Sequence, residues 1–508
     1  MSFLRKSTRD YQPCDYLGTE HLRDGLKGRT VRGGAVTLSA QLIKLVLMLT
    51  STAILARQLT PQDFGLLSMV TVITGFVGLF SDLGLSAATI QQEEINHQQV
   101  SALFWFNSLL GILVMLLTFA CAPLVAWFYQ EPRLLPITMA LGSTFLISGL
   151  SVQHKALLKR QMLFVQLTVI EIASISIGII VAIVAAFYGA RYWALVFQQL
   201  GIQITATLLV WILCGWRPGF VFWDKGLPKL LAFGRNLSGF NIFNYFSRNA
   251  DNFLIGRYWG ASQLGLYSKA YQLLLFPLHQ INAPVSAVAI PALSRLANDP
   301  QKYRRTYLKI IENIAMLTMP MVAFMIATSD WIIQIILGEE WLGASPIFAW
   351  LGVAALVQPI SNTVGWLFIT QDRTDDMLRW GVIGGCITVL SFIIGLPFGT
   401  IGIAILYATS GIFIRAPLLY WFAGRSGSVK MIDFYRAIGY PCMLSLVILI
   451  LLFAAKETVF TFHNPLVGLA AAGMTSFIAA MFLFFLNPKI RESIMENVRI
   501  LKFIKFNS

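Results

Sequence analysis

Long apolar runs, each bounded by a short polar segment, repeat along the whole chain. Each run is about 20 residues long or longer, which an α-helix needs to cross the ~30 Å hydrocarbon core of a bilayer. The runs are continuous rather than alternating, so helices are favoured over the strands of a membrane barrel. Fourteen runs fit this pattern, at 34–56, 66–90, 102–128, 134–153, 165–188, 192–215, 229–250, 264–291, 310–328, 346–369, 379–398, 401–422, 438–455 and 464–486. The pattern predicts an all-α polytopic membrane protein with fourteen transmembrane helices.

The composition supports the same class. Of 508 residues, 56% are hydrophobic and only 12% are charged, which is more apolar surface than a soluble domain of this size can bury. The N-terminal segment 1–32 is polar and basic and lacks the apolar core of a secretory signal, so we expect a cytoplasmic tail. In the basic segment 487–508, apolar residues recur at helical spacing. They fit an interfacial helix, and the charge fits a solvated tail about as well.

The formal net charge of +14 indicates the topology. If the segments between runs alternate across the membrane, most Lys and Arg residues fall on the side of the N-terminus. The other side holds only Arg57, Arg133, Arg191, Arg257 and Lys456. Because cytoplasmic loops carry the excess of positive charge, we expect both termini in the cytoplasm. The same distribution argues against a nucleic-acid partner and favours contact with lipid headgroups.

One motif occurs twice in the chain. The stretch ILARQLTPQDFGLLS at 54–68 is followed 200 positions later by LIGRYWGASQLGLYS at 254–268. This offset aligns Gly65 with Gly265, and it carries the first two runs onto the seventh and eighth. Six runs per repeat is an even number, so both repeats enter the membrane from the same side. The repeats are expected to form two parallel six-helix bundles, followed by two C-terminal helices.

This organisation predicts six segments with short outer connections and no extramembrane domain. They are a cytoplasmic N-terminal tail (1–32), an N-terminal six-helix bundle (33–215), a cytoplasmic or interfacial linker (216–228), a C-terminal six-helix bundle (229–422), two further helices (438–486) and a basic cytoplasmic tail (487–508).

Polar residues recur at spacings of three and four in two equivalent runs, which places them on one face of each helix. In lipid each charge near the centre would cost roughly 2.5–3.5 kcal/mol, so we expect both polar stripes to face a central cavity. The alternative is that Arg248 and Asp251 simply pair with each other. The stripes comprise Gln41, Lys44 and Ser51 in the first run, and Asn241, Asn244, Arg248 and Asp251 in the seventh.

Three acidic residues within or directly beside the apolar runs are candidates for ion coupling or for charge pairing: Asp82, Glu171 and Asp251. Asp82 is a plausible partner for Lys44. Glu171 has no obvious partner in the sequence, so we interpret it as a candidate proton or cation site.

The cations within the runs outweigh the acids in the predicted cavity. Lys44, Arg248 and Arg415 give it a positive excess, which in a low-dielectric site suits an anionic cargo such as a phosphate or an acidic sugar. Arginine matches the geometry of phosphate oxygens especially well.

The sequence contains none of the motifs that would indicate catalysis. There is no G-x-x-x-x-G-K-[ST] loop, no H-E-x-x-H and no C-x-x-C, and the five histidines and five cysteines are scattered. No carboxylate pair lies on a sizeable outer loop, where acid–base chemistry would need it. We therefore expect neither an enzyme nor a metal or other cofactor.

Three stretches resemble the polysaccharide transport family of the multidrug/oligosaccharidyl-lipid/polysaccharide exporter superfamily: NYFSRNADNFLIGRYWGASQLGLYSKAYQLLLFP, ILARQLTPQDFGLLSMV and SDLGLSAATIQQE. Within that family the chain looks most similar to colanic-acid and teichuronic-acid type exporters and to lipopolysaccharide O-unit flippases. The resemblance covers roughly residues 28–486. It leaves the N-terminal tail unexplained.

The resemblance implies a flippase of the bacterial cytoplasmic membrane that works by alternating access. Its cargo would be an undecaprenyl-pyrophosphate-linked oligosaccharide, moved from the inner to the outer leaflet. Lys44, Arg248 and Arg415 are the matching candidates for holding the pyrophosphate or acidic sugars. Membrane lipids and polysaccharide assembly proteins are the expected partners.

The repeated motif is a candidate outer gate. TPQDFG and ASQLG are expected to be turns with Gly65 and Gly265 as turn residues, and Arg57 and Arg257 lie beside them.

Three rival functions stay open. A small-molecule exporter of the same superfamily would favour an acidic cavity. A polysaccharide polymerase or glycosyltransferase would need larger outer loops. A scaffold for polysaccharide assembly would have no use for intramembrane charge.

Overall fold

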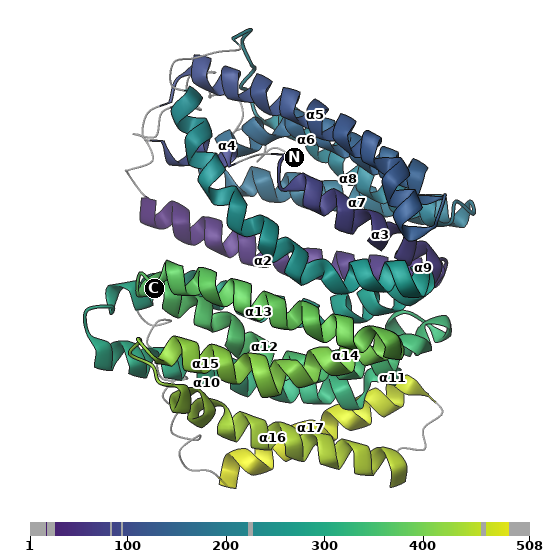
Figure 1. Ribbon diagram of the computed structural model, residues 1–508, viewed down its shortest axis with the longest axis vertical. Helices are drawn as coiled ribbons and strands as arrows, with labels where there is room; N and C mark the ends of the chain where they lie inside the picture. Colours follow the sequence, from purple (N-terminus) through teal and green to yellow (C-terminus); the bar gives the residue numbers. More distant parts are fainter. Residues whose placement is uncertain are drawn as a thin grey trace. The chain divides into compact units, whose positions relative to one another are not determined.

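The computed structural model describes residues 17, 26–81, 84–92, 95–221, 227–458 and 464–486, and every regular element among them is helical (Figure 1). The prediction of an all-α membrane protein is confirmed. The α-helices are α2 (Leu26–Ala56), α3 (Pro61–Gly78), α4 (Leu85–Gln91), α5 (His97–Tyr129), α6 (Leu134–Arg160), α7 (Phe164–Phe187), α8 (Tyr192–Leu213), α9 (Leu227–Arg295), α10 (Pro300–Ala327), α11 (Ser329–Ile336), α12 (Ser345–Thr370), α13 (Thr374–Gly395), α14 (Gly399–Ser410), α15 (Ala416–Gly424), α16 (Met431–Thr458) and α17 (Pro465–Leu486).

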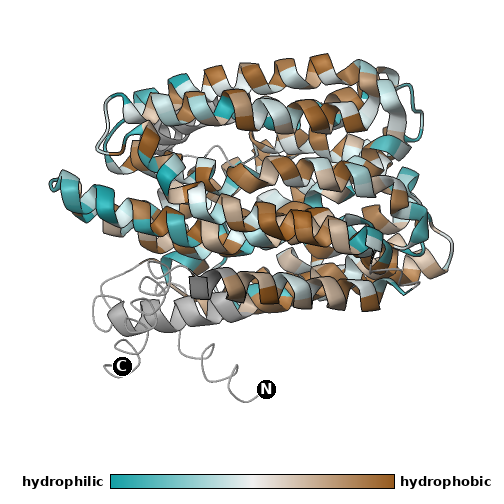
Figure 2. Cartoon of the chain, turned by 90° about the horizontal axis from the view of Figure 1, so that it is seen from below, coloured by the Kyte–Doolittle hydropathy of each residue, from teal (hydrophilic) through white to brown (hydrophobic). Residues whose placement is uncertain are grey.

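Within the described residues, ten helical segments are long and apolar enough to cross a membrane. Two of them, Asn244–Arg295 and Thr374–Gly424, are 52 and 51 residues long. At 1.5 Å per residue this is more than twice the ~30 Å thickness of the hydrocarbon layer. Figure 2 shows apolar residues along the middle of the helices and hydrophilic residues at many of their ends. The protein is a multi-pass membrane protein, and the number of fourteen spans stays a prediction.

Three predicted runs, 66–90, 229–250 and 264–291, differ from the helices that form. Run 66–90 is divided, because α3 ends at Gly78 and α4 begins at Leu85, with Gly84 at a positive φ of 75° in between. Runs 229–250 and 264–291 instead belong to one element, α9, without an intervening loop. Gly260 bends α9 with a non-helical φ of 79° and ψ of 179°, which a residue without a Cβ adopts readily. We call the parts before and after Gly260 the first and second arms.

The start of α3 lies in the stretch that was predicted to be a turn. Thr60 accepts a hydrogen bond from the backbone N–H of Asp63, and the Asp63 carboxylate accepts one from the backbone N–H of Thr60 at 3.0 Å. Pro61 takes the first helical position, where its missing N–H costs nothing. TPQD is therefore a helix-capping box. The 200-residue offset pairs Thr60 with Gly260, so both repeats bend the chain at the same position.

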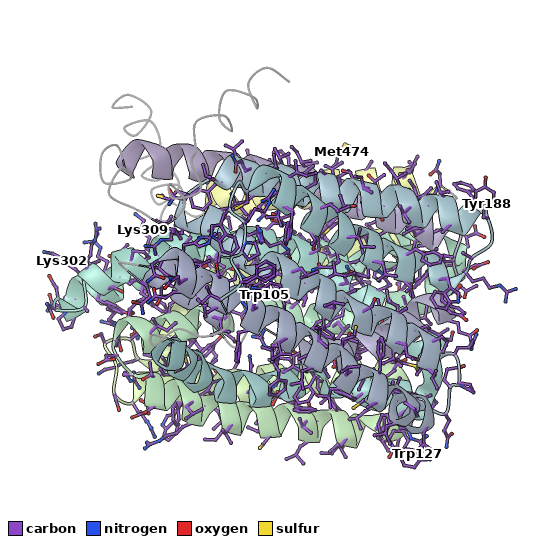
Figure 3. The ribbon with its side chains drawn as sticks, turned by 90° about the horizontal axis from the view of Figure 1, so that it is seen from above. Trp105, Trp127, Tyr188, Lys302, Lys309 and Met474 are labelled. Atoms are coloured by element: carbon purple, nitrogen blue, oxygen red, sulfur yellow. The ribbon has the colours of Figure 1, made fainter. Side chains whose placement is uncertain are left out.

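The chain divides into two compact units, Met1–Ser268 and Lys269–Ser508. In the first unit α5 packs along α6, α7 along α8, and α2 against α7. Trp127 and Tyr188 mark one end of this unit, at the ends of α5 and α7 (Figure 3). The division of the chain into bundles at 216–228 stays a prediction. Residues 222–226 and the predicted C-terminal tail lie outside the described residues.

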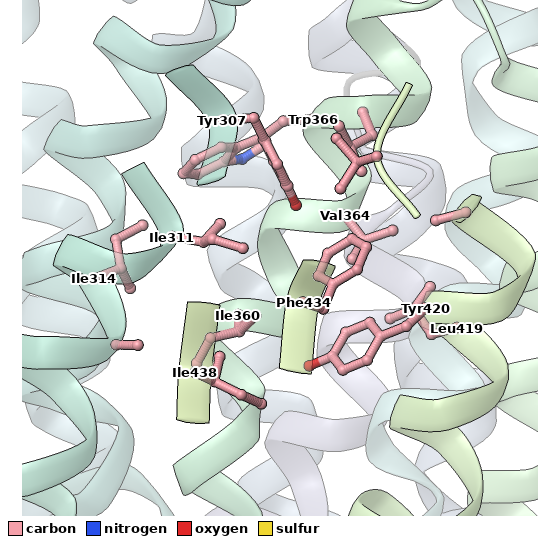
Figure 4. Close-up of a cluster of buried hydrophobic side chains, with 14 of the residues drawn as sticks. Tyr307, Ile311, Ile314, Ile360, Val364, Trp366, Leu419, Tyr420, Phe434 and Ile438 are labelled. Carbon is pink, nitrogen blue, oxygen red and sulfur yellow. The ribbon is translucent and has the colours of Figure 1, made fainter. Parts of the chain in front are cut away.

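The second unit is held by an aromatic core where α10, α12, α15 and α16 meet (Figure 4). Tyr420 stacks on Phe434 with ring centroids 4.5 Å apart. The hydroxyl of Tyr307 hydrogen-bonds that of Thr363 at 2.8 Å. Because the buried hydroxyl of Tyr307 has a hydrogen-bond partner, its ring can be buried at no polar cost and in one fixed orientation.

Candidate functional site

Lys44 of α2 forms an ion pair with Glu171 of α7, with 2.5 Å between Nζ and Oε1. The lysine side chain is 11% exposed and the glutamate side chain 55%. The packing of α2 against α7 brings the two residues together, which agrees with the charge-pairing alternative for Glu171 and supplies the partner that the sequence did not reveal. Asp82, the partner suggested by the sequence, lies outside the described residues.

The rest of the α2 stripe also lies against protein. Ser51 is buried and accepts a hydrogen bond from Nε2 of Gln198 on α8 at 3.3 Å. Gln41 is half-buried. The polar face of α2 therefore points toward α7 and α8 within the first unit.

The α9 stripe separates into a buried anion and an exposed cation. Asp251 is 2% exposed and accepts hydrogen bonds from the Tyr267 hydroxyl at 2.9 Å and from the backbone N–H of Asn252 at 2.8 Å. Arg248, one turn earlier, is exposed, and no ion pair joins it to Asp251 in the part of the chain that the structure describes. The alternative in which these two residues pair is wrong, because the carboxylate is buried against Tyr267 whereas Arg248 is exposed. Asn244 is half-buried, and the side chain of Asn241 lies outside the described residues.

Arg415 belongs to the second unit and is positioned by its own helices. Its guanidinium donates to the Thr388 hydroxyl at 3.1 Å and to the backbone carbonyl of Tyr407 at 2.6 Å. It also stacks 4.2 Å from the centroid of the Tyr407 ring. Its Nε is buried without a hydrogen-bond partner among the described residues. Both terminal guanidinium nitrogens of Arg415 thus donate hydrogen bonds within the second unit. The central cavity with its cationic excess stays a prediction.

The two glycines of the repeated motif lie at a close helix–helix contact. A Cβ built on Gly65 would lie 1.7 Å from the carbonyl oxygen of Ala261, and one built on Gly265 would lie 1.8 Å from that of Pro61. Both glycines are in helices. The prediction that they are turn residues is wrong: the absence of a side chain lets α3 and the second arm of α9 approach each other.

This contact is reciprocal under the 200-residue offset. Gly65 meets Ala261, and Gly265 meets Pro61, the residue equivalent to Ala261. The equivalent serines also meet, with 3.0 Å between the hydroxyls of Ser68 and Ser268. A residue pair that recurs with its partners exchanged is what a local two-fold axis between the two copies of the motif produces.

The contact extends to the first arm of α9. The Tyr245 hydroxyl donates to the backbone carbonyl of Val72 at 2.7 Å, and the rings of Phe76 and Phe246 lie 4.7 Å apart. Within the first unit, α3 thus contacts the first arm of α9 and the start of the second arm, up to Ser268.

The predicted gate arginines flank the contact. Arg57 is exposed in the connection between α2 and α3. Arg257 lies 6.0 Å from the Phe128 ring and 5.9 Å from the Tyr258 ring, near enough for a weak cation–π attraction.

Two basic residues of α6 have roles that the sequence did not reveal. Arg160 is 5% exposed and donates to the backbone carbonyls of Leu17, Thr89 and Gln92. Lys155 interacts electrostatically with Glu171. The sequence gives no sign of either role, because backbone capping and contact with a distant helix have no local sequence signature. Within the described residues, no group of three or more His, Cys, Asp or Glu forms a metal site.

Comparison with known proteins relates this chain to polysaccharide biosynthesis. Residues 54–346 match a family described as polysaccharide biosynthesis protein. The chain is 28% identical over 364 residues to the teichuronic acid biosynthesis protein TuaB of Bacillus subtilis (strain 168), an alignment that covers 71% of this chain and 74% of that protein. It is 26% identical over 387 residues to the lipopolysaccharide biosynthesis protein WzxC of Escherichia coli (strain K12), which covers 75% and 78%.

The fold also has a relative among solved structures. The lipid II flippase MurJ, in an inward closed conformation, superposes with a TM-score of 0.68 over 89% of this chain and 99% of that one, at 16% identity. At this identity the likeness establishes a shared fold.

Proposed function

Because the chain belongs to the family of polysaccharide biosynthesis proteins, we propose that it flips an undecaprenyl-pyrophosphate-linked oligosaccharide from the inner to the outer leaflet of the bacterial cytoplasmic membrane. The alignments with TuaB and WzxC support a role in polysaccharide biosynthesis, and MurJ, which shares this fold, is a lipid II flippase. Both termini lie in the cytoplasm in this proposal, as the distribution of Lys and Arg indicates.

Charge within the membrane supports an anionic headgroup as the cargo. Lys44 and Arg248 in the first unit, and Arg415 in the second, are cations within or beside apolar helical segments. Such residues are costly in lipid and mark transport paths. The pyrophosphate crosses beside these cations while the polyprenyl tail stays in hydrocarbon. The protein acts as a transporter rather than an enzyme.

The observation that carries the mechanism is the reciprocal glycine contact. In alternating access the two repeats separate on one side of the membrane while they close on the other. The contact of Gly65 and Gly265 lies near the connection between the C-terminus of α2 and the N-terminus of α3, which the predicted topology places outside. We assign it to a closed outer gate, which must open before the oligosaccharide leaves.

Leaflet exchange tests the proposed function directly. Full-length protein is reconstituted in liposomes with a fluorescent polyprenyl-pyrophosphate oligosaccharide, and outside quenching reports how much cargo reaches the outer leaflet. We expect faster exchange than in empty liposomes, and loss of it in the Lys44→Ala/Arg248→Ala variant. A matched control is Lys302→Ala, which removes an exposed cation at the start of α10.

Two results would contradict the proposal. Normal exchange in the double variant would show that the cationic path is wrong. No exchange by the folded protein, together with export of a small cationic compound or formation of new glycosidic bonds, would favour a small-molecule exporter or a polymerase. Repeating the assay with a proton or sodium gradient identifies the energy source.

A further inference from the structure

Glu171 interacts with two lysines from different helices. Lys44 approaches it from α2 at 2.5 Å. Lys155 on α6 is attracted electrostatically to Glu171. It is repelled by the charge of Lys159, one helical turn further along α6. The neighbouring helix α8 contributes no charged side chain. Among the described residues the cluster therefore holds more positive than negative charge, with Glu171 as its carboxylate.

Burial within this cluster is uneven. The Lys44 side chain is 11% exposed, so leaving it without a counter-charge would be costly. The Glu171 side chain is 55% exposed, so it can turn away without a large change in its surroundings. An exposed carboxylate within an apolar helix also indicates contact with water rather than with lipid tails. The pair thus consists of a fixed cation and a removable anion.

The depth of the pair fits entry from the cytoplasmic end. Glu171 lies seven residues after Phe164, where α7 begins, which is about 10 Å along the helix. Lys155 and Lys159 lie in the last two turns of α6, whose C-terminus is connected to the start of α7. The positive charges thus extend from the end of the helices inward toward Lys44.

We propose that Glu171 is an internal counter-ion that occupies Lys44 while the transport path is empty, and that the phosphate of the incoming lipid displaces it, with Lys155 as a second phosphate ligand. This inference rests on the proposed function, since it assigns the headgroup of that cargo to a site. One anion replaces another at Lys44, so the buried ammonium is compensated before and after cargo binds. Removing the carboxylate alone strengthens anion binding, whereas in a purely structural ion pair it would only weaken the fold.

The test measures anion binding separately from transport. Full-length protein in detergent is titrated calorimetrically with geranyl pyrophosphate, a short soluble polyprenyl pyrophosphate. We expect Glu171→Gln to bind it about five-fold more tightly, since breaking a partly exposed ion pair costs on the order of 1 kcal/mol, which Gln removes. Lys44→Ala should bind at least about ten-fold more weakly. Lys155→Ala should also bind more weakly.

Control variants separate charge from packing. Glu171→Asp keeps the negative charge and should stay within about two-fold of the natural protein, given the small value of exposed pairs. Glu339→Gln removes an exposed carboxylate elsewhere, in the second unit, and should change nothing. Thermal unfolding of each variant shows whether that variant is folded. If Glu171→Gln does not fold, Lys44→Ala and Lys155→Ala are compared with Glu171→Asp instead, so the site can still be tested.

The outcomes distinguish this inference from the proposed function. Equal or weaker binding by folded Glu171→Gln overturns the counter-ion role, even if leaflet exchange is normal. Unchanged binding by both lysine variants overturns the site. Tighter binding by Glu171→Gln, with no exchange of lipid-linked oligosaccharide by the natural protein, supports the anion site and shows that the cargo is wrong.

Discussion

Gly65→Ala should weaken the contact that we assign to the closed outer gate. The new Cβ would lie 1.7 Å from the carbonyl oxygen of Ala261, whereas ordinary contacts begin at 3.4 Å. The obstructing atom belongs to the backbone of a helix and cannot rotate away. The two helices must therefore separate by roughly 1.7 Å at this point.

The separation has a calculable effect on gate closure. Moved apart by that amount, the hydroxyls of Ser68 and Ser268 would go from 3.0 Å to roughly 4–5 Å, beyond hydrogen-bond range. Overpacking of this kind costs about 1–3 kcal/mol. If the open state is not strained, the ratio of closed to open gates falls roughly 5- to 150-fold.

Disulfide trapping measures this ratio. Ser68→Cys and Ser268→Cys are introduced after the five native cysteines are replaced by alanine, and a protease site is inserted at 222–226. After the protease has cleaved the chain, the N-terminal and C-terminal fragments stay covalently joined only in molecules in which the disulfide has formed. We expect rapid cross-linking that stops leaflet exchange until a reductant is added, and slower cross-linking in the Gly65→Ala background.

The matched control is Gly439→Ala, where a Cβ would meet nothing within 4 Å. It should cross-link as the parent does. If Gly65→Ala cross-links at the parent rate, the close contact is not a feature of the closed state and the gate assignment is refuted. If the disulfide forms fully without slowing exchange, the contact does not have to open during transport.

Three further predictions follow from single contacts. Tyr267→Phe leaves the buried Asp251 without its side-chain donor, so thermal unfolding should show a loss of about 1–3 kcal/mol; an unchanged melting temperature would mean that water replaces the hydroxyl. Arg415→Lys cannot keep both hydrogen bonds and the ring stacking, and should lower the melting temperature more than a conservative exchange on the surface does. The Arg133 guanidinium hydrogen-bonds Glu131 and holds the pKa of that carboxyl below its usual range. The pair should therefore stabilise the protein above about pH 4.3 and lose this effect as pH falls further. In Glu131→Gln the melting temperature should depend less on pH in that range.

The sequence by itself determined where the helices lie. Runs of about 20 apolar residues in a bilayer must satisfy their backbone hydrogen bonds internally, and that requirement depends only on local sequence. Thus α7, α8 and α12 begin and end within two residues of the predicted runs. The 200-residue repeat was also visible directly, because a duplicated motif needs no structure to be recognised.

Only the tertiary structure decided which residues meet and what the glycines do. Lys44 pairs with Glu171 because α2 packs on α7, and no periodicity within one run specifies a partner in another. Gly65 and a turn glycine look alike in a sequence, since both replace a side chain with hydrogen. A close backbone approach between two helices distinguishes them, and that distance exists only once α3 and α9 have packed against each other.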